Sequence, residues 1–296
     1  MPDQHKVLFT ADLHGNIAQY TAMLEIAKQE GIQSIIIGGD ITPTDEGINP
    51  AKQRVFLEDT LPALIRKSDT IIPLYLMFGN DDAACNNDVL ENYNGTLWFT
   101  IEGKRSTIAP SRHIVGYPYI PLAPFAIKDY EKFDRKPVQP TALLKKIFRE
   151  SPVAPNAVLR GYRSCGAGLI EEVVFDKSNI TDTIEEDLKS AHMTFSPRET
   201  IYVFHSPPYN TRLDLLPHMQ HVGSKAIRQF IETQRPLLVL SGHIHETVDV
   251  SGTFVDSING SICATAGNRH ESGIFSYLTF DAYAPQRTLK RKNVRM

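Results

Sequence analysis

Five short apolar runs of this chain each lead into residues that bind divalent metals, and this regularity constrains the fold more than any other feature. Short apolar runs that close on a polar turn are typical of parallel strands buried on both faces. In open α/β sheets, ligands bind beyond the carboxyl ends of such strands. We therefore expect an α/β fold that gathers these polar residues at one sheet edge: Asp12, His14, Asp40, Asn80, His205, His243 and His245.

The mixture of donor atoms at this edge indicates which metals it would bind. Carboxylate and amide oxygens occur together with imidazole nitrogens, which suits Mn, Fe, Zn or Co better than the all-oxygen sites of Ca or Mg. Each residue also has an ordinary explanation: Asp12 could cap a helix, Asp40 could form a turn, and His205 could be a buried core residue. The joint occurrence of seven such residues favours a metal centre.

Bulk properties exclude several classes of protein. The length of 296 residues suits one domain with an insertion, and the net charge of −3 gives no general attraction to nucleic acid or membranes. Three widely spaced cysteines argue against a disulfide framework and for a reducing compartment. No apolar run has the length of a signal peptide's core at the start of the chain, or of a membrane span elsewhere. We therefore expect a cytoplasmic protein without a membrane partner.

The order of the expected elements supports an α/β fold. In the first part of the chain, Asn16 can cap a helix that Gly31 ends, and a second helix should begin near Pro50 and be kinked or broken by Pro62. Further on, Ser224 can cap a helix. Strands are expected near 7–11, 34–39, 71–78, within 95–116, and near 200–204, 237–240, 253–256, 261–265 and 274–280.

Residues 117–180 differ from the rest of the chain in composition. Seven of the chain's 19 prolines fall between positions 118 and 155, and one helix, over about 141–150, should interrupt this stretch. A loop-rich segment of this length inside a compact domain is usually a lid, a binding loop or a contact surface. We interpret 117–180 as an insertion that shapes the pocket or forms a homodimer contact. The segment 285–296, which is rich in Lys and Arg, is expected to form a solvated tail.

Taken together, five motifs resemble those of the calcineurin-like metallophosphoesterase family, in the same order and spacing from residue 6 to about residue 270. The sequence around Pro207 and His221 is similar to that of the Icc-related phosphoesterase branch of the family. Each motif alone is unspecific. The motifs are Asp12-Leu13-His14-Gly15, Gly38-Gly39-Asp40, Gly79-Asn80-Asp81-Asp82, His205-Ser206-Pro207-Pro208 and Gly242-His243-Ile244-His245.

The resemblance implies two facing mixed β-sheets flanked by helices and a centre of two divalent metals, with manganese the expected ion. Asp40 would bridge the metals. The first metal would also take Asp12, His14 and His245, and the second Asn80, His205 and His243. Two metals about 3.5–4 Å apart can hold both the attacking and the leaving oxygen of an in-line displacement. The implied activity is hydrolysis of a phosphodiester or a small phosphomonoester by a hydroxide that bridges the metals.

One position departs from the family pattern. The family usually has Gly-Asn-His-Asp where this chain has Gly79-Asn80-Asp81-Asp82. The missing histidine normally contacts the phosphate and can protonate the leaving group. Ionised, Asp81 would repel a phosphate; protonated, it could act as a general acid; facing water, it would do neither. We take Asp40, Asp81 and Asp82 as the candidate catalytic residues.

Four further residues are candidates for substrate binding. His221 and Ser224 precede an expected helix, and helix N-termini bind anions. Arg212 lies seven residues after His205, and Arg269 follows a late strand, so both could reach the mouth of the site.

Other functions remain alternatives. A nuclease or a protein phosphatase would share the chemistry, but the acidic balance argues against a nucleic-acid groove. A catalytically weak or inactive scaffold that binds a protein partner is the alternative from another class, and Asp81 is its only support. The presence of all seven candidate ligands favours the enzyme.

Overall fold

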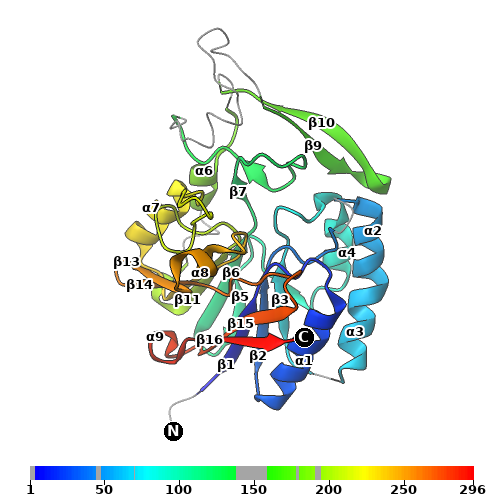
Figure 1. The fold of residues 1–296 in the computed structure, drawn as a ribbon, viewed down its shortest axis with the longest axis vertical. Coiled ribbons are helices and arrows are strands. Elements are labelled where there is room, and N and C mark those ends of the chain that lie inside the picture. Colours follow the sequence, from blue (N-terminus) through cyan, green and yellow to red (C-terminus); the bar gives the residue numbers. More distant parts are fainter. Residues whose placement is uncertain (1–3, 45–47, 70, 138–158, 178–179, 191–194) are drawn as a thin grey trace.

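The computed structural model describes residues 4–44, 48–69, 71–137, 159–177, 180–190 and 195–296. Two six-stranded mixed sheets face each other, with helices on their outer sides (Figure 1), which confirms the predicted architecture. The first sheet has the order β16–β15–β1–β2–β3–β4, formed in that order by Lys290–Arg295, Ile274–Asp281, Lys6–Thr10, Ser34–Gly38, Leu74–Met77 and Phe99–Thr100.

The second sheet differs from the first, in which β15 runs antiparallel to both β1 and β16 and the other pairs are parallel. Its inner strands run parallel, whereas one strand at each edge is antiparallel to its neighbour. The strand order is β13–β14–β12–β11–β6–β5, formed by Val255–Ile258, Ser261–Thr265, Leu238–Ser241, Thr200–Phe204, Arg112–Tyr117 and Ser106–Ala109.

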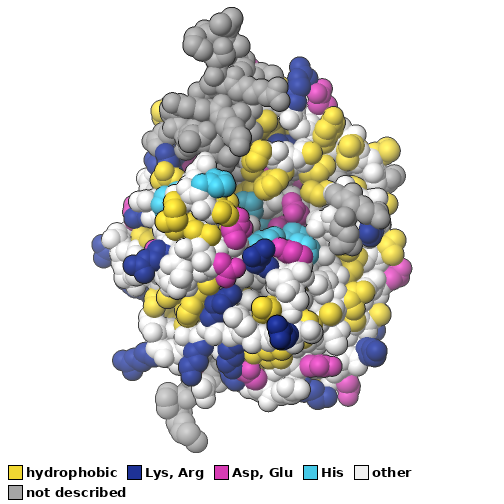
Figure 2. Space-filling model, viewed as in Figure 1, with side chains coloured by type: hydrophobic (Ala, Val, Ile, Leu, Met, Phe, Trp, Pro, Cys, Tyr) yellow, Lys and Arg dark blue, Asp and Glu magenta, His cyan; other side chains and the backbone are white. Residues whose placement is uncertain are grey.

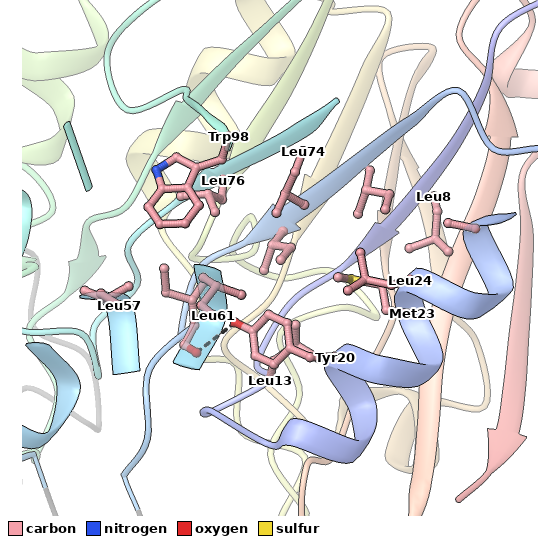
Figure 3. Close-up of a cluster of buried hydrophobic side chains, with 14 of the residues drawn as sticks. Leu8, Leu13, Tyr20, Met23, Leu24, Leu57, Leu61, Leu74, Leu76 and Trp98 are labelled. Atoms are coloured by element: carbon pink, nitrogen blue, oxygen red, sulfur yellow. Dashed lines mark hydrogen bonds between the residues drawn. The ribbon is translucent and has the colours of Figure 1, made fainter. Parts of the chain in front are cut away.

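Both faces of the inner strands are buried, which explains their continuous apolar sequence. In β1, Leu8 packs under the helices that cover the first sheet (Figure 3), whereas Val7 and Phe9 pack between the two sheets. In β11, Ile201 lies between the sheets and Tyr202 faces the helices of the second sheet. Because alternate residues meet different apolar layers, only the strand ends remain open to solvent and to ligands.

Helices complete the outer layers, and their capping follows the sequence signals. The side chains of Asn16, Asn49, Thr183 and Ser224 each accept a backbone amide at the start of a helix. The helices are α1 Ile17–Gln29, α2 Pro50–Val55, α3 Leu61–Lys67, α4 Asn87–Asn92, α6 Ile184–Leu188, α7 Lys225–Gln234, α8 Thr247–Ser251 and α9 Pro285–Thr288. Short 3₁₀ turns occupy η2 Ala84–Asn86, η3 Gly166–Gly168 and η4 Pro197–Glu199.

The α-helix expected to be kinked or broken by Pro62 is divided in two, and Pro62 lies in the first turn of the second helix, α3. Between α2 and α3 the chain forms a π-helical segment, η1 Phe56–Thr60, in which the amide of Leu61 bonds to the carbonyl of Phe56. An α-helix would leave the carbonyl of Glu58 without its donor, because proline has no N–H. The hydroxyl of Tyr93 donates to that carbonyl at 3.3 Å. The helix therefore passes Pro62 by widening one turn.

The described part of the expected insertion forms two small sheets. Strands β7 Ile120–Pro121 and β8 Glu131–Lys132 pair in parallel, and β9 Leu159–Cys165 and β10 Leu169–Phe175 form an antiparallel hairpin. The helix expected over 141–150 lies outside the described residues. In Figure 1 these elements lie beyond the edge at which β1, β2 and β3 end.

The expectation of a solvated basic tail is wrong. Lys290–Arg295 forms β16, an edge strand that pairs with β15. The guanidinium of Arg291 donates to the carbonyl of Ala266 at 2.6 Å, and the ammonium of Lys292 lies 2.7 Å from Glu30. The charge run concealed a strand because edge strands commonly carry charged side chains.

A fully buried ion pair lies in the loop between β7 and β8. The Nζ of Lys128 is 2.7 Å from Oε2 of Glu131, and both side chains are inaccessible to solvent. Both groups also bond to the backbone of Ala123: Lys128 donates to its carbonyl at 2.6 Å, and Glu131 accepts its amide at 2.7 Å. Burial lowers the pKa of Lys128 and raises that of Glu131 to about 7, opposed in each case by the partner's charge.

We predict that Lys128→Met will destabilise the protein by about 3–5 kcal/mol, because it leaves the buried Glu131 carboxylate without its partner. The double variant Lys128→Met/Glu131→Leu should recover at least half of that loss, since it removes both charges. Urea unfolding would measure the free energies. The control is Lys104→Met, which breaks an exposed pair with Glu91 and should cost less than about 1 kcal/mol. A double variant as unstable as the single one would contradict this account of the pair.

Candidate metal centre

The predicted ligands meet where strand ends of both sheets come together. Asp12, Asp40 and Asn80 follow β1, β2 and β3 of the first sheet, and His205 and His243 follow β11 and β12 of the second. The ring of His205 bonds across to the first sheet, with Nδ1 2.8 Å from the carbonyl of Gly38. Figure 2 shows histidine and acidic side chains gathered in a hollow of the surface.

The backbone adopts an uncommon conformation at four of these residues. Asp12, His14, Asp40 and His243 all have positive φ angles, of 57°, 43°, 52° and 69°. Residues other than glycine rarely adopt this conformation, which costs about 1–3 kcal/mol each and is found mainly at functional sites. Hydrogen bonds between the two loops stabilise it: the amide of Asp12 donates to Gly39, and that of His14 donates to Asp40.

Two glycines allow the carboxylates to approach the neighbouring backbone closely. A Cβ atom on Gly79 would lie 2.3 Å from Oδ1 of Asp40, and one on Gly242 would lie 3.0 Å from the carboxylate of Asp12. Contacts below about 3 Å are not tolerated by real side chains. Any other residue at position 79 would therefore displace Asp40.

The first group of candidate ligands is compact. One donor atom each from Asp12, His14, Asp40 and His245 lies within 4.8 Å of all the others. Nε2 of His14 is 3.3 Å from Nε2 of His245 and 3.8 Å from Oδ2 of Asp40. These four residues are the set expected around the first metal.

A second group shares the same Asp40 oxygen. Nε2 of His205 lies 3.2 Å from Oδ2 of Asp40 and 3.0 Å from Oδ1 of Asn80. The ring of His243 lies 5.4 Å from that of His205, measured between centroids. Asp40 therefore stands between the two groups, as a bridging residue would.

The hydrogen bonding of His205 reveals why this second group requires a cation. The carbonyl of Gly38 can only accept, so Nδ1 carries a proton and donates it. Nε2 then faces two oxygens, from Asp40 and Asn80. If Nε2 is unprotonated, three lone pairs converge, and this arrangement is stable only around a positive ion. In other words, the position holds either a proton or a metal.

The ionisation of the histidines reflects the same excess of negative charge. Burial opposes protonation of His205, but the Asp40 carboxylate raises its pKa to about 10. Asp12 likewise overcomes burial and raises the pKa of His245 to about 9. Among the described residues, Asp12 and Asp40 have ion pairs with histidines but none with Lys or Arg. The site thus fits divalent cations, whose binding would displace these protons.

Asp81 faces the site. Its Oδ2 lies 3.8 Å from Nδ1 of His14, and its Oδ1 accepts a hydrogen bond from the side-chain amide of Asn80 at 2.7 Å. Its backbone amide donates to Asp40 at 2.9 Å. Burial and the carboxylates of Asp40 and Asp82 raise the pKa of Asp81 to about 8. Of the possibilities open from the sequence, simple exposure to water does not describe this half-buried carboxyl.

Asp82 has contacts of a different kind from those expected of a catalytic residue. It is fully buried and does not line the pocket described below. Its oxygens accept the backbone amides of Ile41 at 3.1 Å, Thr42 at 2.9 Å and Gly79 at 2.8 Å. The carboxylate joins the loops that follow β2 and β3, and so holds Asp40 and Asn80 in position.

The predicted substrate residues of the 221–224 segment are engaged in structural contacts. Nδ1 of His221 lies 2.7 Å from the buried Asp214. Ser224 caps α7 and also donates to the carboxylate of Asp134, which accepts the amides of Lys225 and Ala226. The helix N-terminus therefore already has an anion, so the expected phosphate contact does not form there.

The two arginines expected near the substrate lie outside the pocket described below. The backbone of Arg212 stabilises its loop. Its amide donates to the carboxylate of Asp256 at 3.0 Å, and its carbonyl accepts from the hydroxyl of Thr247 at 3.0 Å. Arg269 is exposed and lies 3.5 Å from both Asp249 and Glu271. The guanidinium of Arg269 therefore has acidic partners of its own, Asp249 and Glu271, whereas the contacts of Arg212 are made by its backbone.

His270 lies at the site, although its neighbour Arg269 is the candidate predicted from the segment 267–270. Its ring lies 4.3 Å from that of His14, and a donor atom of His270 lies within 4.8 Å of those of His14 and His245. It follows β14, whose neighbour β12 runs parallel to it. The rule that located the other ligands, a polar residue after a parallel strand, selected this segment, but the charge of Arg269 drew attention away from His270.

A pocket of about 420 Å³ opens beside the metal centre. It is lined by candidate ligands and Asp81, by the loop after β7, and by the loops that follow β11 and β12. The lining residues are Asp40, Asn80, Asp81, Pro121, Ala123, Pro124, Phe125, Leu216, Val222, His243, Ile244, His245 and Glu246.

None of the helices in the described ranges has both the length and the apolar character needed to cross a membrane.

Comparison with solved structures shows the fold. The protein TT1561 of Thermus thermophilus superposes with a TM-score of 0.58 at 17% identity, over 99% of this chain and 100% of that one. A dimetal phosphatase from Danio rerio matches with a TM-score of 0.47 at 10% identity, over 99% of both chains. An archaeal phosphodiesterase matches with a TM-score of 0.41 at 10% identity, over 98% and 99%. No curated protein sequence matches the chain.

The sequence comparison with protein families identifies the chain more directly. The family described as calcineurin-like phosphoesterase matches residues 5–247, which include all seven predicted ligands. The chain therefore belongs to the calcineurin-like phosphoesterase family and is a metal-dependent phosphoester hydrolase.

Proposed function

We propose that this protein hydrolyses a phosphodiester or a small phosphomonoester at a centre of two divalent metals, with manganese the expected ion. The observation that carries the proposal is the position of Asp40. Its Oδ2 atom faces His14 at 3.8 Å on one side and His205 at 3.2 Å on the other. A carboxylate placed between two groups of ligands is suited to bridging two cations about 3.5–4 Å apart.

Each group of ligands has a distinct role. Asp12, His14 and His245 would hold the first cation, beside which His270 lies. Asn80, His205 and His243 would hold the second. Two divalent cations bound there supply a nucleophile at neutral pH and stabilise the negative charge that develops on the phosphoryl oxygens. The carbonyl of Gly38 fixes the orientation of the His205 ring, and the buried Asp82 fixes the loops that carry Asp40 and Asn80.

By the resemblance, Asp81 stands at the position of the histidine that can protonate the leaving group. In the protein without metals its carboxyl has a raised pKa and would be protonated at neutral pH, whereas bound cations favour its ionised form. As a carboxylate it repels a phosphate and cannot protonate a leaving group. We therefore propose that Asp81 weakens hydrolysis of esters with poor leaving groups.

This same position supports the alternative function, a phosphoesterase fold with little catalysis that binds a protein partner. The complete set of candidate ligands favours the enzyme, because a scaffold does not require them. Metal content measured together with turnover distinguishes the two functions.

The first test is hydrolysis of bis-p-nitrophenyl phosphate by the purified protein with added Mn²⁺. We expect turnover that a chelator abolishes and that returns when Mn²⁺ is restored. Metal analysis should find two ions per chain, as the two groups around Asp40 require. Two bound metals without turnover of this diester or of p-nitrophenyl phosphate would favour the scaffold.

We predict that Asp40→Asn removes the bridge between the two groups of ligands. Turnover should fall by at least about 100-fold, because even groups that only orient a metal ligand contribute 10–100-fold. Metal content should fall below two per chain. The matched control is Asp249→Asn, which alters an exposed carboxylate and should leave both quantities unchanged. Full activity with two metals in Asp40→Asn would refute the assignment.

We also predict that Asp81→His raises turnover of phosphodiesters, since it removes a negative charge and adds a group that can protonate the leaving oxygen. Asp81→Asn separates these effects because it removes the charge alone. The gain of Asp81→His over Asp81→Asn should be larger for diphenyl phosphate, whose phenolate is the poorer leaving group, than for bis-p-nitrophenyl phosphate only if proton donation to the leaving oxygen contributes. Unchanged or lower turnover in Asp81→His would contradict the proposed effect of Asp81.

A further inference from the structure

The pocket beside the metal centre has a wall that phosphate chemistry alone does not require. Beyond the candidate ligands, most of its lining is apolar: Pro121, Pro124, Phe125, Leu216, Val222 and Ile244. Phe125 is 45% exposed, so its ring is open to a ligand in the pocket. Its ring lies edge-on to that of His243, with 6.1 Å between centroids. The aromatic surface therefore begins directly beside a candidate metal ligand.

The charges of the pocket are as informative as its apolar wall. No Lys or Arg lines it within the described part of the chain, whereas Asp81 and Glu246 contribute carboxyl groups. Sites that recognise a second phosphate or a carboxylate use Arg or Lys for that purpose. A substrate with a second anionic group would be repelled by the acidic residues without any compensating contact.

The wall is held in place by the buried ion pair of the loop between β7 and β8. Both backbone polar groups of Ala123 are bonded, the carbonyl to Lys128 and the amide to Glu131. Ala123 is 6% exposed and immediately precedes Pro124 and Phe125. Phe125 is thus presented by a segment whose position is fixed before any ligand binds.

We propose that this pocket selects phosphoesters in which a single phosphoryl group carries an uncharged apolar or aromatic group, and that Phe125 contacts that group. The proposal rests on the proposed function, since the phosphoryl group must lie at the metal centre. The volume of about 420 Å³ lies within the range of pockets that hold small organic ligands. It can accommodate an aromatic ring together with a phosphoryl group.

The test uses three p-nitrophenyl phosphodiesters whose second ester group is phenyl, methyl or 4-carboxyphenyl. The leaving group is the same in all three, so differences in kcat/KM report contacts of the second group. With the Mn²⁺-loaded protein we expect kcat/KM for the phenyl ester to exceed that for the methyl ester by about tenfold or more, as burial of apolar surface in a pocket implies. The 4-carboxyphenyl ester should fall below the phenyl ester by a similar factor.

A binding measurement makes the test independent of turnover. Calorimetry would compare phenylphosphonate, methylphosphonate and 4-carboxyphenylphosphonate, none of which is hydrolysed. Phenylphosphonate should bind most tightly. Phe125→Ala should reduce its advantage over methylphosphonate. The control Phe99→Ala removes an aromatic side chain of similar exposure, 38%, that does not line the pocket, and should leave the ratio unchanged.

The outcomes separate this proposal from the proposed function. The selection proposed for the pocket would be overturned if kcat/KM and affinity were equal within each series, or if the carboxylated compounds were preferred. Mn²⁺-dependent turnover in the same experiment would still support the hydrolase. Tighter binding of phenylphosphonate without turnover of any ester would support the pocket and overturn the proposed reaction. A ratio that Phe125→Ala leaves unchanged would exclude Phe125 as the contact.

Discussion

The buried carboxylate of Asp40 is the constraint on which the active edge of this molecule depends. A buried charge is costly unless it is paired, and several segments meet to pair this one. The loop after β3 donates the amide of Asp81, β11 leads into His205, and the loop after β1 brings His14. The left-handed backbone at Asp40 places the carboxylate at their centre. Positive charge at this point, whether from protons or from metals, therefore stabilises both the site and the contact between the two sheets.

The layered fold explains why the chemistry is confined to one edge. In the middle of β1 and β2, alternate side chains pack against the helices and against the opposite sheet, so the stretches 7–9 and 35–37 have no polar side chain on either face. At the ends of the parallel strands the chain passes beyond these apolar layers, while its backbone is still buried. Each loop there begins with buried backbone and carries one or two polar side chains, and five such loops from two sheets form a centre that no single segment could build.

Much of this organisation could be predicted from the sequence because it depends on local signals. Apolar runs such as Ile35–Ile37 mark strands buried on both faces, and the residues after them mark the edge. The ligands of distant segments could be brought together by this rule, but pairings that no local signal marks could not be predicted. Ser224 follows the rule for an anion-binding helix start, but Asp134, ninety positions earlier, already fills that place. Asp82 was expected to be a catalytic carboxylate, but it accepts the amides of Ile41 and Thr42 from the loop after β2 and that of Gly79 from its own loop.

The buried pair of Lys128 and Glu131 has a consequence for how this molecule can change over time. The loop that it fixes contributes Phe125 to the pocket, yet the pair belongs to neither large sheet and touches none of the candidate ligands. Substitutions at Pro124 or Phe125 can reshape the pocket without moving any strand end. The segment that we propose to contact the substrate therefore lies outside the strand ends that carry the candidate ligands, so it can vary between related proteins while those ligands stay in place.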